Sequence, residues 1–211
     1  MVSVDALSAA IARHDWRDAL KHALAATYGF PRELLVAQAV AMLRKYLPLF
    51  ESHHPDARWV RQLLASPESP DWDTIALGFD ALRPGSAGDA SFLRAIDGLT
   101  SALSADSHAG VVRGSLHAVG QSIEARANEA WESSDPEAVA LWRRLNGHVP
   151  DEHAAVRLRG RTTFDNESAR AERQRAWREY ASVLAAMPDF PADPAEVEEV
   201  WRAWLERELE P

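Results

Sequence analysis

The chain has 211 residues, of which 46% are hydrophobic and 26% are charged. These fractions are typical of a globular protein and oppose intrinsic disorder over most of the length. The formal net charge of −9 opposes a nucleic-acid partner, because such binding depends on Lys and Arg side chains that neutralise phosphates. The absence of cysteine excludes disulfides, thiolate nucleophiles and cysteine zinc sites.

The cellular location follows from what the chain lacks. No segment has the pattern of a signal peptide, and none approaches the ~20 consecutive apolar residues that a membrane span needs. We therefore expect a soluble, cytoplasmic protein without a membrane partner. The acidic balance suits docking onto a basic protein.

Apolar residues recur every three to four positions along the chain, and no long run alternates with period two. This pattern predicts an all-α fold: one domain of residues 1–211, built as an orthogonal or antiparallel bundle of about nine helices with no significant sheet. In chain order, the helical patterns cover approximately residues 4–11, 16–28, 31–50, 59–64, 72–82, 89–103, 109–132, 136–145, 167–187 and 193–209.

Several boundaries carry local signals. Aspartates that cap helix N-termini are expected at Asp15, Asp71, Asp89, Asp135 and Asp193. Pro48, near the end of the 31–50 helix, is expected to kink or stop it. Residues 146–166 contain few apolar side chains and are interpreted as an irregular loop.

Eight tryptophans stand in the chain, and most of them, Trp72 included, lie on helical stripes that indicate core packing. The C-terminal helix, 193–209, carries Trp201 and Trp204 on one apolar face. So much aromatic area must dock either on the domain itself or on another subunit. Trp201 and Trp204 are therefore candidate interface residues, and one hypothesis for this chain is a structural component that forms a homo-oligomer.

A polar stripe runs along the predicted 109–132 helix and contains Arg113, His117, Gln121 and Glu124. A base, an imidazole, an amide and an acid in line could bind a small ligand or transfer protons if they faced a cleft. On a single helix, such residues more often form the solvated face, where pairs at i and i+4 support helicity. Both interpretations stay open, and the stripe is a candidate binding site.

The same helix carries a second stripe of small residues: Gly110, Gly114, Ala118 and Ser122. Small residues at four-residue spacing allow another backbone to approach closely, although glycine lowers helix propensity. Close helix packing is the favoured interpretation, and a groove for a partner is the alternative.

The sequence gives little support for a metal site or for catalysis. His53, His54 and Asp56 lie at one turn and are potential metal ligands, but adjacent residues rarely reach the same ion. A polar turn is favoured, so we expect neither a metal site nor a cofactor. No glycine-rich phosphate loop, zinc-protease helix motif or nucleophile elbow is present. No catalytic residue is assigned, and a non-catalytic protein is favoured over an enzyme.

One stretch, about residues 36–64, resembles a known family. It contains the run Leu47–Phe50, the turn His54–Asp56 and the basic residue Arg58, in the order in which they follow an alanine-rich helix in Imm5-like immunity proteins of bacterial toxin systems. Trp59 stands where that family normally has a proline. The resemblance implies a non-catalytic protein that binds and blocks a toxin, with His54, Asp56 and Arg58 as candidate binding residues.

Three hypotheses therefore follow from the sequence. The first is a helical protein that acts by binding another protein, for example as an immunity-type inhibitor. The second is an enzyme or small-ligand binder with a pocket on the 109–132 helix. The third is the oligomeric component that uses the C-terminal helix.

Overall fold

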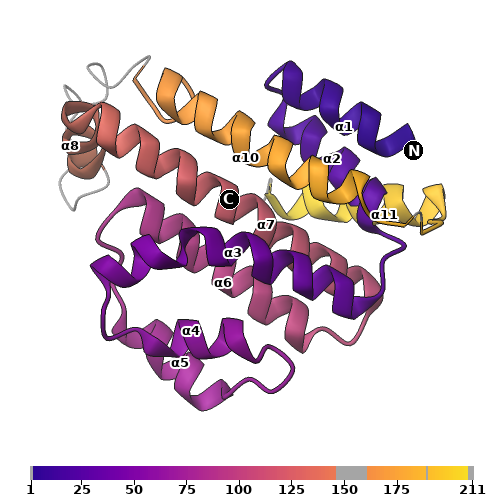
Figure 1. Ribbon diagram of the computed structural model, residues 1–211, viewed down its shortest axis with the longest axis horizontal. Coiled ribbons are helices and arrows are strands. Elements are labelled where there is room, and N and C mark those ends of the chain that lie inside the picture. Colours follow the sequence, from indigo (N-terminus) through magenta and orange to yellow (C-terminus); the bar gives the residue numbers. More distant parts are fainter. Residues whose placement is uncertain (1, 146–160, 189, 209–211) are drawn as a thin grey trace.

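The computed structural model describes residues 2–145, 161–188 and 190–208, and within these ranges the protein is all-α without a strand (Figure 1). The predicted fold class is thereby confirmed. The described ranges contain ten helices, close to the predicted number. Their bounds are α1 (Val2–Ala12), α2 (Trp16–Thr27), α3 (Arg32–His53), α4 (Arg58–Ala65), α5 (Trp72–Ala81), α6 (Ala87–Ser104), α7 (His108–Ser134), α8 (Pro136–Leu145), α10 (Glu167–Ala185) and α11 (Pro194–Glu208).

Most of the predicted aspartate caps are present. Asp15, Asp71, Asp135 and Asp193 each accept a hydrogen bond from a backbone N–H in the first turn of the helix that follows, at 2.9–3.1 Å. The prediction for Asp89 was wrong. Ser86 is the N-cap of α6, and its hydroxyl accepts the Asp89 N–H at 2.9 Å. Asp89 itself lies in the first turn with its side chain fully buried.

Pro48 does not end α3, contrary to one of the two predicted outcomes. The helix continues five residues further, to His53, and Pro48 lies on its exposed side. A proline in a helix removes one backbone hydrogen bond and crowds the preceding turn. Tyr46 and Phe50, which are 2% and 0% exposed, anchor the helix on either side of the proline.

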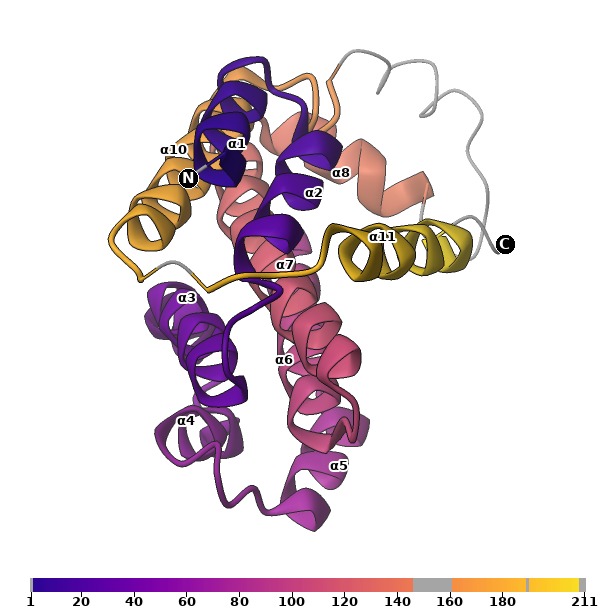
Figure 2. The ribbon, with the colours of Figure 1, turned by 90° about the vertical axis from the view of Figure 1, so that its right-hand side faces the viewer.

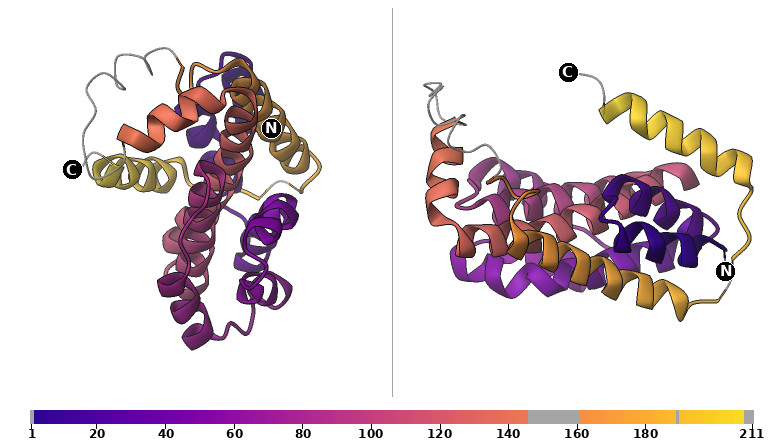
Figure 3. Two further views of the ribbon diagram at one scale, coloured as in Figure 1. Left: turned by 90° about the vertical axis from the view of Figure 1, so that its left-hand side faces the viewer. Right: turned by 90° about the horizontal axis from the view of Figure 1, so that it is seen from above.

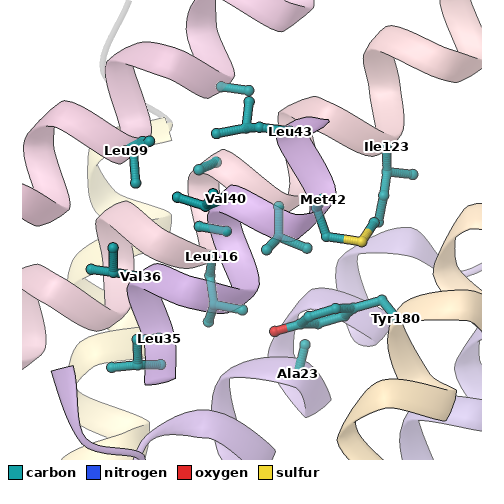
Figure 4. Close-up of a cluster of buried hydrophobic side chains, with 14 of the residues drawn as sticks. Ala23, Leu35, Val36, Val40, Met42, Leu43, Leu99, Leu116, Ile123 and Tyr180 are labelled. Carbon is teal, nitrogen blue, oxygen red and sulfur yellow. The ribbon is translucent and has the colours of Figure 1, made fainter. Parts of the chain in front are cut away.

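The centre of the fold is the antiparallel pair α6 and α7 (Figures 1 and 2). Helix α3 packs across this pair, α10 packs along α7, and the α1–α2 hairpin packs against α10. Figure 4 shows part of the resulting core, where Val40 and Leu43 of α3 lie near Leu116 of α7. Helices α4 and α5 lie at the opposite end of the molecule from α1 (Figure 2).

Helices α6 and α7 approach so closely because glycines meet at their contact. A Cβ atom placed on Gly114 would lie 2.5 Å from the backbone N of Ala102, and one on Gly98 would lie 2.8 Å from that of Ala118. Further along α7, the Ser122 hydroxyl donates to the Met42 carbonyl of α3 at 2.9 Å. The small-residue stripe thus serves close helix packing, as predicted.

Helix α11 lies to one side of the bundle and packs against α2 and α7 (Figure 3). Trp201 and Trp204 are only 6% and 8% exposed and belong to the main core. Of the two predicted arrangements, docking on the domain itself is the one observed. No described helix is both long and apolar enough to cross a membrane.

Candidate functional site

An exposed apolar surface surrounds Trp72, the first residue of α5. The prediction that Trp72 belongs to the core was wrong, because its exposed fraction is 45%. The residue borders a cleft of about 660 Å³ between α3 and the loop that joins α4 to α5. We call this cleft the Trp72 groove; its apolar lining includes Val36, Val40, Leu64, Pro67, Pro70 and Leu103.

The groove is built on rigid elements. Val36 and Val40 lie one turn apart on α3 and are 8% and 5% exposed. Across the groove, Pro67 and Pro70 restrict the backbone of the loop. Asp71 then fixes the start of α5, since its carboxylate accepts the Thr74 N–H at 3.1 Å and the Thr74 hydroxyl at 2.8 Å. Trp72 is therefore held at the mouth of a preformed apolar cleft.

The two arginines that line the groove are occupied by backbone carbonyls. Arg32 donates to the Ala102 and Ala105 carbonyls at the C-terminus of α6, at 3.3 and 2.8 Å. Arg44 donates to the Leu64 carbonyl of α4 at 2.6 Å. Both side chains supply the partners that the last carbonyls of a helix lack.

The acidic groups of the groove are, by contrast, available. Glu33 and Glu68 are exposed, and their carboxylates form no hydrogen bond or ion pair with any residue that the structure describes. The free charge on the Trp72 groove is therefore negative, beside an apolar floor. This pattern matches a segment that combines apolar and basic side chains.

The predicted polar stripe of α7 is divided between two other cavities. Arg113 and His117 border one of about 670 Å³, which is closed on one side by Trp204 of α11. Gln121 and Glu124 border another of about 440 Å³, which we call the Arg94 cavity after the α6 arginine opposite them. The four residues share a face of α7, as predicted, but they do not converge on one site.

Glu124 is not a free acid. Its two oxygens accept hydrogen bonds of 2.7 Å from Nε and Nη2 of Arg173 on α10. The Arg173 side chain is 0% exposed, and its guanidinium lies 4.8 Å from the Phe164 ring and 5.8 Å from the Trp16 ring. The burial of Arg173 was not predicted from the sequence. A charged residue in a helix with many acidic and basic side chains is normally assigned to the solvated face.

The turn that contains the predicted residues His54, Asp56 and Arg58 is tied to the start of α6. Nε2 of His54 lies 3.1 Å from Oδ2 of the buried Asp89, and Nδ1 of His53 lies 3.1 Å from both of its oxygens. Asp56 and Arg58 are exposed and form no side-chain bond with a described residue. Only His54 of the three thus has a defined partner.

The surroundings of Asp89 are rich in acids. Burial raises the pKa of Glu129, and the neighbouring carboxylates of Glu132 and Asp89 raise it further. Burial and Asp89 also raise the pKa of the Tyr46 hydroxyl far above its usual range. Even so, no three His, Asp or Glu side chains within the described ranges are arranged to hold a metal ion. The geometry is that of a polar junction between α3 and α6.

Comparison with known proteins yields no relative. No family model matches this chain, no curated protein matches it, and no solved structure matches it. The function of this chain is therefore inferred from the geometry of its surfaces.

Proposed function

We propose that this chain is a non-catalytic helical protein that acts by binding another protein, as an immunity-type inhibitor does, and that the Trp72 groove is its docking surface. The observation that carries the proposal is the 45% exposure of Trp72 above a preformed apolar cleft. Large aromatic side chains that fill pockets dominate the binding energy of many protein interfaces.

The resemblance to immunity proteins covers the same part of the molecule. Residues 36–64 form most of α3 and most of α4, and they contribute Val36, Val40, Arg44 and Leu64 to the groove. An inhibitor needs only a surface that matches its target, and these residues form one wall of the groove. The resemblance and the exposed surface thus support the same role.

The charge of the groove defines the chemistry of the partner. Glu33 and Glu68 have no cation among the described residues, and the whole chain carries a formal charge of −9. A partner segment with a large apolar side chain between Lys or Arg residues would bury its apolar part against Trp72 and neutralise these carboxylates. Such charge complementarity accelerates association and selects the partner.

The test begins with site-specific cross-linking in the cells that encode the protein. A photoreactive benzoylphenylalanine replaces Ala37, which lines the groove, or Leu77, which is 70% exposed on α5 and does not line it. A polypeptide captured from position 37 and not from position 77 is identified by mass spectrometry and purified. We expect a basic protein.

Calorimetry with the purified partner then measures the contribution of the groove. We expect Trp72→Ala to weaken binding about thirtyfold, as an aromatic anchor worth about 2 kcal/mol would. Leu77→Ala should leave the dissociation constant unchanged, and higher salt should raise it. If the partner is toxic alone, co-expression of the wild type and not of Trp72→Ala should restore growth. Equal binding by Trp72→Ala and the wild type would overturn the proposal.

A further inference from the structure

A second site, independent of the Trp72 groove, lies where α6 and α7 meet the segment that precedes α10. We propose that the Arg94 cavity binds a small organic carboxylate with a flat apolar body. The cavity has a volume of about 440 Å³, within the range of small-molecule sites. Its lining combines a guanidinium, two carboxamides and aromatic rings, which is the composition expected of a ligand pocket.

The uncompensated charge at this cavity is positive. Glu124 is neutralised by Arg173 through two hydrogen bonds of 2.7 Å. Arg94 is exposed and has no hydrogen bond or ion pair with any described residue. A planar guanidinium pairs with a carboxylate through two parallel hydrogen bonds. The cavity therefore favours a ligand that carries one negative charge.

Neutral hydrogen-bonding groups stand beside Arg94. The Gln121 carboxamide makes no hydrogen bond to a described residue, so it can both donate to and accept from a ligand. Asn128 donates to the Ser91 hydroxyl at 2.9 Å and to the Ala87 carbonyl at 3.4 Å, which fixes its side chain and leaves its carboxamide oxygen as an acceptor. Charge recognition by Arg94 is thus joined to directional polar contacts.

Aromatic side chains complete the walls. Trp131 is 2% exposed, and its indole N–H donates to the Arg161 carbonyl at 3.0 Å, so its ring is held in place. Phe164 is 60% exposed at the rim, with its ring over the buried Arg173 guanidinium at 4.8 Å. One face of the Phe164 ring is occupied by Arg173, and the exposed remainder can cover a flat ligand.

Calorimetric titrations of the full chain with three small probes test the site. Benzoate has both the carboxylate and the flat body, benzamide keeps the body without the charge, and acetate keeps the charge without the body. We expect benzoate to bind at millimolar or lower concentration, and the other two probes to bind at least about tenfold more weakly, as loss of a charge-assisted hydrogen bond or of apolar burial requires. Benzoate binding no tighter than benzamide binding, or no benzoate binding up to about 10 mM, would overturn the proposal.

Variants locate the binding. Arg94→Gln removes the charge, and Ala90→Phe fills the cavity while Arg94 stays in place. Each should weaken benzoate binding at least about tenfold. Arg17→Gln, which removes an exposed arginine of α2 that does not line the cavity, should leave benzoate binding unchanged. Thermal denaturation verifies that every variant is folded. If Arg94→Gln binds benzoate as the wild type does, the site is elsewhere and the inference fails, whatever the outcome at the Trp72 groove.

Discussion

Arg173 and Glu124 join α10 to α7 through a two-point ion pair in which the guanidinium is completely buried. Removing one partner of such a pair leaves a charge without compensation in a poorly solvated place. We expect Glu124→Gln to lower the free energy of unfolding by about 3 kcal/mol, because Arg173 keeps its charge. Urea denaturation at pH 7 measures this change.

The control for this pair replaces both charges. Glu124→Leu combined with Arg173→Met removes the buried guanidinium together with its partner, so the double variant should be more stable than Glu124→Gln alone. A double variant that is as unstable as Glu124→Gln, or less stable, would show that lost packing around Trp16 and Phe164 outweighs the unpaired charge.

The close approach of α6 and α7 at Gly114 gives a second prediction. A methyl group there would lie 2.5 Å from the backbone N and 2.8 Å from the Cα of Ala102, so the helices must separate. We expect Gly114→Ala to lower the free energy of unfolding by about 2 kcal/mol.

Gly120 of the same helix provides the matched control, since a Cβ atom there would meet nothing within 4 Å. Gly120→Ala should raise the stability by about 0.5–1 kcal/mol through the better helix propensity of alanine. Equal effects of the two substitutions in urea denaturation would contradict the claim that backbone proximity selects glycine at position 114.

The ion-pair network around Glu179 of α10 should make the stability of the fold depend on pH in the acid range. Hydrogen bonds from Arg126, with a further contribution from Lys45, lower the pKa of Glu179 to about 2. Because the folded-state pKa lies below the usual value of 4.5, ionised Glu179 stabilises the fold above about pH 4.5. That stabilisation is lost as the pH falls toward 2.

The side chain of Glu179 is 31% exposed, so solvent screening reduces its contribution. We expect Glu179→Gln to lower the free energy of unfolding at pH 7 by about 1 kcal/mol, and the difference from the wild type to shrink steadily below pH 4.5. Chemical denaturation between pH 7 and pH 3 follows this difference. If the difference in the free energy of unfolding does not depend on pH, the shape of the Glu179 side chain, and not its charge, stabilises the fold.

Ionised Glu129 should have the opposite effect and lower the stability of the fold. Burial, together with the Glu132 and Asp89 carboxylates, raises its pKa, so its ionised form is disfavoured in the folded state. Glu129→Gln should therefore raise the stability at pH 7, on the order of 0.5 kcal/mol for a partly exposed charge. The gain should shrink as the pH falls through the raised pKa and vanish below about pH 4.5, where Glu129 of the wild type is protonated in both the folded and the unfolded state. Destabilisation at pH 7 in the same denaturation series would contradict this assignment.

Much of the local structure could be predicted because its causes are local. The return of apolar residues every three to four positions fixes helices, and an aspartate such as Asp71 caps the helix that follows through its own neighbours. The errors occurred where a local rule met tertiary packing. Pro48 was tolerated because Tyr46 and Phe50 anchor α3 before and after the proline. At the start of α6, the Ser86 hydroxyl is the cap, while the Asp89 carboxylate contacts His53 and His54.

The sequence by itself determined that this protein is helical and that small residues allow α7 to pack closely against its neighbours, since both depend on spacing along a single helix. Only the tertiary structure decided that Trp72 is exposed, that Glu124 is neutralised by a buried Arg173, and that Arg94 has no hydrogen bond or ion pair with any residue in the described ranges. These features depend on which faces meet between segments far apart in the chain. Side-chain periodicity gives the face of a helix, while the packing of whole helices decides what that face contacts.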